Sequence, residues 1–194
     1  MPNLYIIAGC NGAGKTTASY TVLPEMLNCE EFINADEIAR GLSPFNPDKV
    51  SIEAGRIMLL KIKKLIMNQH DFAFETTLST KSYINTIQKA KENMYEITLV
   101  YFWLDSVELA IERARTRVAE GGHDIPENVI RRRYFSGIKN LFKLYFPVCN
   151  YWMIIDNSNP ILELIAEGSY TNEIIIKNSS KFEQLKNISS YDSK

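Results

Sequence analysis

A glycine-rich segment near the start of the chain, from Gly9 to Thr16, carries the strongest chemical signal. It reads Gly-Cys-Asn-Gly-Ala-Gly-Lys-Thr and matches the pattern G-x-x-x-x-G-K-[ST] at every fixed position. In this pattern the glycines let backbone N–H groups surround a phosphate. The apolar run 4–8 before the segment and a helical pattern after it give the strand–loop–helix context of a nucleoside triphosphate site. A chance glycine turn between a strand and a helix is the alternative.

Lys15 and Thr16 have the side chains that act on a phosphate and a metal ion. The Lys15 ammonium is predicted to reach the β- and γ-phosphates, and the Thr16 hydroxyl is predicted to ligate Mg²⁺. We therefore expect ATP and Mg²⁺ as cofactors. The residues predicted to bind ATP are Gly9, Asn11, Gly12, Ala13, Gly14, Lys15, Thr16, Thr17 and, after the fifth strand, Asn157.

These residues need a scaffold, and most of the chain alternates strand and helix patterns. The predicted strands are 4–8, 31–34, 72–74, 97–104 and 152–155, and the predicted helices are 15–27, 36–40, 48–68, 81–93, 107–118 and one that Pro126 opens. Apolar strands that alternate with amphipathic helices predict a parallel sheet covered by helices on both faces. The strand 97–104 is expected at the centre of this sheet because it is the most strand-like segment.

The tail of the chain departs from this alternation. Two short strand patterns, 162–166 and 173–177, flank Gly168 and Ser169, so we predict a hairpin that turns at these two residues. A polar helix at 180–188 is expected to follow the hairpin.

Ligands of open α/β sheets bind beyond the carboxyl ends of the strands, so the residues just after each predicted strand are the candidates for chemistry. These residues are Asn34, Asp36 and Glu37, then Glu75, Thr76 and Thr77, then Asp105, and finally Asp156 and Asn157. Acids around a triphosphate are what metal binding and activation of a hydroxyl require. Asp36 is the candidate catalytic base, and Glu75 and Thr76 are candidate substrate ligands.

Each of these acids also has a structural alternative. Asp36 can cap the helix that follows it, although Asn34 can cap equally well. Glu75 can be a strand-terminal residue that turns to water. Asp105 has Glu108 three residues on, which is the spacing of a capping box. We favour the cap for Asp105 and keep a metal ligand as its alternative.

A basic segment follows the central strand. Residues 113–143 hold eight Lys and Arg but only three Asp and Glu. A Gly-Gly pair at 121–122 and Pro126 separate two basic helices with a flexible and then a stiff connector. This pattern predicts a lid over about 113–145 that brings arginines onto phosphates, and a solvated basic face is the alternative. We expect His123, within the connector, to pack in the lid or contact substrate rather than to act as a base.

Charge spacing separates the arginines of the predicted lid into two groups. Arg131 has Glu127 four residues earlier, so an ordinary helix ion pair explains it. The arginines that lack an acid at this spacing are Arg113, Arg117, Arg132 and Arg133. Of these, we expect Arg117, Arg132 and Arg133 to act on phosphates.

Composition limits the class of protein. A net charge of −1 over 194 residues argues against a general nucleic-acid or membrane-surface binder. Three cysteines far apart predict reduced thiols in the cytoplasm. A phosphate loop that begins at Gly9 leaves no room for an N-terminal signal, and no apolar stretch approaches the length of a membrane span. We expect one domain over 1–194, with a C-terminal hairpin and helix at about 161–188.

With these residues assembled, the chain resembles the zeta-toxin-like P-loop kinases, particularly their short branch. The matching segments, in family order, are GCNGAGKTT (9–17), FINADEIARGLSP (32–44), FETTLS (74–79), RVAEGGHDIP (117–126), IRRRY (130–134) and DNS (156–158). The resemblance covers residues 4–158. It implies a three-layer P-loop kinase fold with a helical lid.

The resemblance also implies roles for individual residues. Asp36 matches the base that takes the proton of the acceptor hydroxyl, and Glu75 matches a glutamate that contacts the substrate. The lid arginines that neutralise the transferring phosphate match Arg117 and either Arg132 or Arg133. Arg40 lies in the second matching segment and is a candidate substrate ligand. The founding toxins of this family phosphorylate the amino sugar of UDP-N-acetylglucosamine and are held inactive by small antitoxins.

The sequence thus predicts an ATP-dependent small-molecule kinase with a hydroxyl acceptor, a UDP-amino-sugar being one candidate, and a small antitoxin as a candidate partner. The alternative from another class is a nucleotide-dependent switch or a partner-binding ATPase. A nucleoside or nucleotide kinase of different specificity is the third hypothesis. Asp36 and the lid favour a kinase, since a switch needs no acceptor base.

Overall fold

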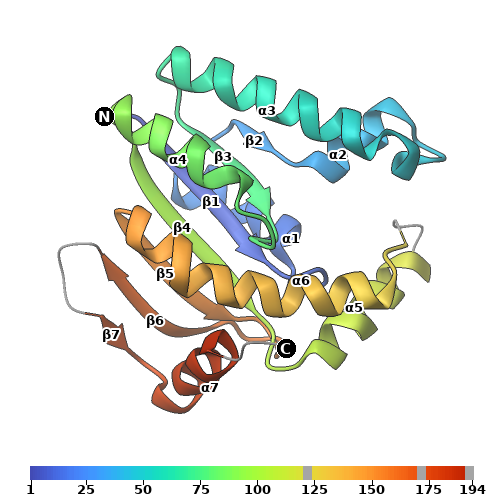
Figure 1. Ribbon diagram of the computed structural model, residues 1–194, viewed down its shortest axis with the longest axis vertical. Helices are drawn as coiled ribbons and strands as arrows, with labels where there is room; N and C mark the ends of the chain where they lie inside the picture. Colours follow the sequence, from blue (N-terminus) through green and yellow to red (C-terminus); the bar gives the residue numbers. More distant parts are fainter. Residues whose placement is uncertain (120–123, 170–173, 191–194) are drawn as a thin grey trace.

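A computed structural model describes residues 1–119, 124–169 and 174–190 (Figure 1). In this part of the chain seven strands form one sheet in the order β2-β3-β1-β4-β5-β6-β7. The strands are β1 (Asn3–Gly9), β2 (Phe32–Ile33), β3 (Phe72–Thr76), β4 (Glu96–Trp103), β5 (Tyr151–Asp156), β6 (Glu163–Ser169) and β7 (Ile175–Ile176). Strands β1 to β5 are parallel, as predicted, and β6 and β7 add two antiparallel strands at one edge.

Helices cover both faces of this sheet. They are α1 (Lys15–Met26), α2 (Ala35–Leu42), α3 (Ser51–Met67), α4 (Ser82–Glu92), α5 (Val107–Ala119), α6 (Glu127–Asn140) and α7 (Ser179–Ser190). Short turns of other helix types are η1 (Pro47–Val50), η2 (Leu141–Tyr145) and η3 (Phe146–Val148). Helices α4 and α6 lie in front of the strands in Figure 1, and α1 lies behind them. The predicted three-layer P-loop fold is confirmed.

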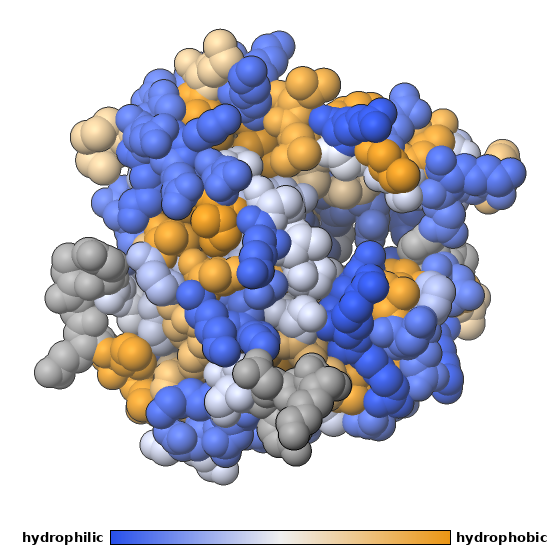
Figure 2. Space-filling model, viewed as in Figure 1, coloured by the Kyte–Doolittle hydropathy of each residue, from blue (hydrophilic) through white to orange (hydrophobic). Residues whose placement is uncertain are grey.

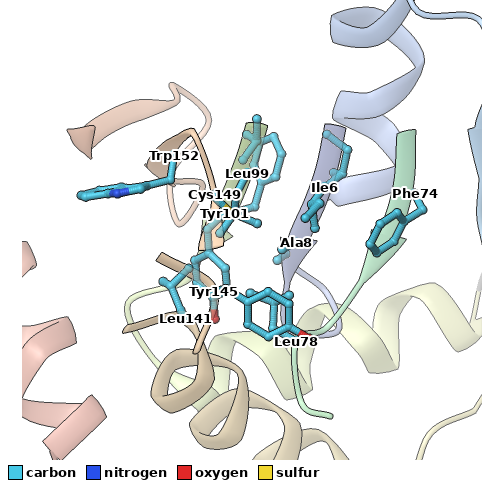
Figure 3. Packing of buried hydrophobic residues seen from close by; sticks show 14 of the residues in the cluster. Ile6, Ala8, Phe74, Leu78, Leu99, Tyr101, Leu141, Tyr145, Cys149 and Trp152 are labelled. Carbon is cyan, nitrogen blue, oxygen red and sulfur yellow. The ribbon is translucent and has the colours of Figure 1, made fainter. Parts of the chain in front are cut away.

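Strand β4 lies at the centre of the sheet, as its sequence predicts. It pairs with β1 over seven residues and with β5 over six, and its residues 97 and 99–103 are buried. The close-up in Figure 3 shows Leu99 and Tyr101 of β4 beside Ile6 of β1. Burying these large side chains between two helical layers fixes the carboxyl ends of β1, β3 and β4 beside one another.

The C-terminal hairpin is confirmed, but the predicted turn at Gly168 and Ser169 is wrong. Both residues belong to β6, and the connection to β7 falls within 170–173, outside the described residues. Packing explains this glycine: a Cβ atom at Gly168 would lie 2.6 Å from the ring of Trp152. The Trp152 ring in turn stacks on Phe146 at a centroid distance of 3.9 Å. Gly168 therefore makes room for a ring and does not form the turn.

Helices α5 and α6 form the predicted basic segment. Ion pairs join them, from Arg115 to Glu127 at 2.9 Å and from Arg131 to Glu108 at 2.9 Å. The connector residues 120–123, which include the Gly-Gly pair and His123, lie outside the described residues, so the predicted hinge and the role of His123 stay predictions. No helix of the described residues is long and apolar enough to cross a membrane.

Candidate nucleotide-binding and catalytic site

A polar cleft of about 540 Å³ opens at the carboxyl ends of β1, β2 and β3. It lies between the surface over α2 and α3 and the surface over α5 and α6, where Figure 2 shows a hollow with hydrophilic side chains at its rim. The predicted site residues that line it are Asn11, Gly12, Gly14, Lys15, Thr16, Thr17, Asp36, Glu75, Thr76, Arg117 and Arg133. One edge of the sheet therefore gathers most of the predicted site residues.

The phosphate loop has the backbone that its glycines permit. Gly9 has a φ angle of 143°, and a Cβ atom there would lie 2.2 Å from the carbonyl oxygen of Phe102. Gly14 has a φ angle of 78° and is the residue before α1. A Cβ atom at Gly14 would lie 2.4 Å from the Nδ2 atom of Asn157. Gly12, Gly14 and Thr16 line the cleft, so the loop and the start of α1 border it, which is where an anion site of this kind lies.

Asn157 hydrogen-bonds to the phosphate loop and does not line the cleft. Its Nδ2 atom donates to the carbonyl of Ala13 at 2.9 Å, and its backbone N–H donates to the carbonyl of Trp103 at 2.9 Å. Arg113 fixes the same turn, because its guanidinium donates to the carbonyls of Asn157 at 2.7 Å and Ser158 at 2.9 Å. Arg113 lines the cleft as well.

Lys15 is buried at the base of the cleft. Its Nζ atom donates to the carbonyl of Cys10 at 2.9 Å and lies 3.4 Å from the Oε1 atom of Glu75. Burial raises the pKa of the Cys10 thiol to about 11, so this cysteine is a neutral packing residue rather than a nucleophile. The Lys15 ammonium is therefore the cation at the base of the phosphate loop.

A hydrogen-bonded group joins the phosphate loop to β2 and β3. The Thr16 hydroxyl donates to the Oε2 atom of Glu75 at 2.7 Å. The Nδ2 atom of Asn34 donates to the same Oε2 atom at 2.9 Å and to the Thr16 hydroxyl at 3.4 Å. Glu75 is therefore not a strand-terminal residue that turns to water, because its carboxylate faces the phosphate loop.

Asn34 also decides the role of Asp36. Asn34 is the N-cap of α2, and its Oδ1 atom accepts the backbone N–H of Asp36 at 2.8 Å. Asp36 therefore does not cap this helix, and its carboxylate is free to face the cleft. The Oδ2 atom of Asp36 lies 3.9 Å from the Nη2 atom of Arg117.

The arginines fall into the predicted groups, with one exception. Arg131 donates to Glu127, so the predicted ion pair is confirmed. Arg131 also donates to Glu108 on α5, a contact that the spacing along one helix could not predict. Arg133 donates to the Oδ1 atom of Asn11 at 3.3 Å, and burial lowers the pKa of its guanidinium. Arg132 is exposed and does not line the cleft. The contacts therefore favour Arg133 over Arg132 as the arginine of α6 that acts at the site.

Asp105 lies apart from the cleft, and it is not the helix cap. Helix α5 begins at Val107, so Ser106 precedes it, and the Ser106 hydroxyl accepts the N–H of Leu109 at 3.4 Å. The Asp105 carboxylate accepts the hydroxyl of Ser106, while its N–H donates to Ser158. Asp105 is exposed, and this placement does not favour its alternative role as a metal ligand.

Arg40 lies at the margin of the site. It pairs with Glu37 at 3.3 Å and lines a small adjoining cavity of about 30 Å³ together with Asp36 and Arg117. Thr76 lines the main cleft, and its hydroxyl accepts the N–H of Leu78 at 3.1 Å.

The loop after β3 and the start of α4 supply cleft residues that the sequence did not assign, which are Ser79, Thr80, Ser82 and Tyr83. Thr77, already a candidate in the sequence, lines the cleft beside them. Asn140 donates to the carbonyl of Leu78 at 2.6 Å, and the Tyr145 hydroxyl donates to that of Thr80 at 2.9 Å, so α6 and η2 fix the loop. The Ser/Thr-rich run at 76–82 was a signal that could have found this wall of the cleft.

Comparisons with known proteins agree with this geometry. A family model described as Zeta toxin matches residues 1–146. The chain belongs to the zeta toxin family. An uncharacterised protein of Haemophilus influenzae is 34% identical over 126 residues, which are 65% of this chain and 88% of that protein.

Solved structures of similar fold include an ORF1–ORF2 complex with ATP and a structure from a toxin–antitoxin system. AvrRxo1-ORF1 with AvrRxo1-ORF2 and ATP aligns with a TM-score of 0.76 and 15% identity over 100% of this chain, which spans 66% of that chain. The PezAT toxin–antitoxin system of Streptococcus pneumoniae aligns with a TM-score of 0.66 and 16% identity over 97% of this chain and 86% of that chain. At these identities the likeness shows the fold.

Proposed function

We propose that this member of the zeta toxin family is an ATP-dependent kinase that transfers the γ-phosphoryl group to a hydroxyl of a small molecule. The observation that carries the proposal is the freedom of Asp36. Asn34 caps α2, so the Asp36 carboxylate lies in the cleft without a helix-capping role. A carboxylate beside a phosphate loop suits a base that accepts the proton of an acceptor hydroxyl.

The charges of the cleft suit a polyphosphate. Its lining has four cationic side chains and two carboxylates, which are Lys15, Arg113, Arg117 and Arg133 against Asp36 and Glu75. Phosphoryl transfer depends on positioning and on stabilising charge, so these cations would hold the phosphates and the transferring group. Backbone N–H groups of the phosphate loop would bind the same phosphates.

The oxygen donors at the base of the cleft fit Mg²⁺. Thr16 contributes a hydroxyl beside a carboxylate, which is the kind of oxygen ligand that this cation takes. Bound Mg²⁺ would neutralise charge on the β- and γ-phosphates. Among the described residues no group of three or more His, Cys, Asp or Glu side chains could hold a metal by itself, which agrees with a metal that arrives with the nucleotide.

The proposal also names a class of acceptor and a protein partner. The wall formed by Thr76, Thr77 and Ser79 offers hydroxyl groups to a polar acceptor. Arg40, at the margin of the cleft, and His123, which lies outside the described residues, remain candidate acceptor ligands. A UDP-amino-sugar is the acceptor to test first, because family resemblance suggests it. A small antitoxin is the proposed partner, supported by the toxin–antitoxin complex among the similar structures.

The experiment that tests the proposal is transfer of labelled γ-phosphate from ATP. Purified protein is incubated with ATP, Mg²⁺ and either a metabolite extract or UDP-N-acetylglucosamine, and mass spectrometry identifies the metabolite that gains phosphate. We expect one acceptor to gain phosphate with wild-type protein and not with Asp36→Asn. If ADP forms at the same rate with and without every acceptor, a nucleotide-dependent switch replaces the kinase hypothesis. A nucleoside or nucleotide acceptor would instead favour the third hypothesis.

A further inference from the structure

The C-terminal helix α7 lies outside residues 1–146, which the family model matches, yet it is tied to the turns that follow β4 and β5. The Nζ atom of Lys181 donates to the Oδ2 atom of Asp156 at the end of β5, and to the Oε2 atom of Glu163 at 2.6 Å. The Nε2 atom of Gln184 donates to the carbonyl of Asp105 at 3.1 Å. Both turns leave the sheet at the same edge as the phosphate loop. Figure 1 shows α7 beside this end of β5 and β6.

Asp156 connects α7 to the phosphate loop. This residue is 2% exposed, and its Oδ1 atom accepts the backbone N–H of Ser158 at 2.8 Å and the Ser158 hydroxyl. These bonds fix the turn at 156–158, whose middle residue is Asn157. The Nδ2 atom of Asn157 donates to the carbonyl of Ala13 at 2.9 Å. A short series of bonds, through Asp156 and Asn157, therefore joins Lys181 to the phosphate loop.

Local helix rules do not explain a lysine at position 181. Helix α7 begins at Ser179, so Lys181 lies in its first turn, where the helix dipole disfavours a cation. The backbone N–H of Lys181 is already satisfied, because it donates to the Oδ1 atom of Asn178 at 3.1 Å. The side chain of Lys181 is 25% exposed and is held by two carboxylates from β5 and β6. A residue that conflicts with a local rule in this way has a tertiary role, which here is the tie to Asp156.

We propose that Lys181 is a positioning residue for the nucleotide, which acts through Asp156 and Asn157 to hold the phosphate loop in the conformation that binds ATP. This inference rests on the proposed kinase function and adds to it a C-terminal element that sets the affinity for ATP. A loop that is ordered before its ligand arrives loses less conformational freedom on binding, so it binds more tightly. Lys181 itself does not line the cleft, so it acts on ATP only through the loop.

The test measures the affinity of the full chain for ATP with Mg²⁺ by isothermal titration calorimetry, at a temperature at which a thermal melt shows every variant to be folded. Lys181→Met should weaken ATP binding by about 2- to 30-fold, the range that corresponds to residues which act through a network of contacts. Lys186→Met is the matched control. It removes a lysine of the same helix that pairs with Glu183 at 3.0 Å, and it should keep the wild-type affinity.

A second variant separates the lost tie from the charge that Lys181→Met leaves unpaired. Asp156→Asn/Lys181→Met removes both charges of the pair, so it is expected to fold even if the single variant does not. It should bind ATP as weakly as Lys181→Met, because α7 no longer holds the turn at 156–158. Wild-type affinity in this double variant would assign the loss in Lys181→Met to an unpaired buried carboxylate and would overturn the proposal.

A double-mutant cycle tests the route through Asn157. Asn157→Ala removes the bond to Ala13 and should weaken ATP binding by itself. Adding Lys181→Met to it should weaken binding little further, because both residues act on the same bond. Fully additive losses overturn this route. Wild-type affinity in folded Lys181→Met overturns the positioning role and leaves the kinase proposal intact. If wild-type protein does not bind ATP, the kinase proposal fails and this inference fails with it.

Discussion

The Nη2 atom of Arg117 lies 3.9 Å from the Oδ2 atom of Asp36, so an arginine of α5 faces the carboxylate at the start of α2 across the cleft. The side chains are 40% and 54% exposed, and an ion pair this exposed adds little to stability. Its importance is positional, because it brings a cation that can stabilise a phosphoryl group beside a carboxylate that can accept a proton. Each half of this pair can be tested separately.

Asp36→Asn removes the proton acceptor and preserves the shape of the side chain. We expect phosphoryl transfer to fall by about 10²–10⁴-fold, because general base catalysis contributes rate factors of that order. ATP affinity and thermal stability should stay unchanged, since Asn34 provides the helix cap. Turnover, ATP titration and a thermal melt check the three expectations. A substantial loss of stability with activity retained would show that Asp36 has a structural role instead.

Lys15→Ala removes the cation at the base of the phosphate loop. Transfer should fall by about 10²–10³-fold, the loss seen when one group that stabilises transition-state charge is removed. The variant should also lose stability, because Glu75 keeps its buried charge without Lys15. The double variant Lys15→Ala/Glu75→Gln should regain that stability without regaining transfer. Denaturant unfolding and turnover of both variants check this, and unchanged turnover in folded Lys15→Ala would disprove the site.

The arginines of α5 and α6 give a matched pair of variants. Arg117→Ala should lower turnover by about 10²-fold while it changes ATP affinity much less, because its partner is the charge on the group in transfer. Arg131→Ala should have little effect on turnover, since Glu127 and Glu108 hold that side chain away from the cleft. Arg133→Ala should resemble Arg117→Ala, and Arg132→Ala should resemble Arg131→Ala. Steady-state kinetics and ATP titrations of the four variants measure these effects. A large loss of turnover in Arg131→Ala would refute the use of ion pairs to separate structural from catalytic arginines.

Asp156 gives a pH-dependent test of the fold. Burial alone would raise the pKa of this carboxyl, but hydrogen bonds from Lys181 and Ser158 outweigh burial and hold its pKa below the ordinary value. Because the folded pKa is the lower one, the stabilisation is complete above the unfolded pKa of about 3.9 and is lost as the pH falls through the folded value. Lys181→Met should lower stability at neutral pH and weaken this acid dependence. Urea unfolding between neutral and acidic pH measures both effects, and an unchanged acid dependence in the variant would contradict the assignment.

The sequence was sufficient to predict the features that are local. The phosphate loop and α1 follow from glycines and a lysine at fixed spacing within one segment, and the parallel core follows from alternating apolar strands and helices. The ion pair of Arg131 with Glu127 was predictable for the same reason, because one helical turn joins the two residues.

The features that the sequence could not predict join distant segments. Glu75 contacts Thr16 across 59 residues, and Arg131 contacts Glu108 across 23 residues on another helix. Gly168 was assigned to a turn because glycine favours turns, yet the ring of Trp152 requires a glycine there. Asp105 was assigned to the cap because its spacing to Glu108 fits a capping box, while Ser106 lies one residue nearer to the helix.

Asn34 connects the two halves of the proposed chemistry, because its Oδ1 atom caps α2 at Asp36 and its Nδ2 atom donates to Glu75. Asn34→Ser should keep the cap, so its stability should fall by much less than the roughly 0.5–2 kcal/mol that a lost cap costs. The same substitution removes the amide that orients Glu75. Asn34→Asp should also keep the cap, yet it places a second negative charge beside Glu75. The Asp variant should therefore lose more transfer and more ATP affinity without Mg²⁺ than the Ser variant, at similar thermal stability. Melting temperatures, turnover and ATP titrations of the two variants measure this. Unchanged transfer in both variants would mean that Asn34 acts through the cap alone.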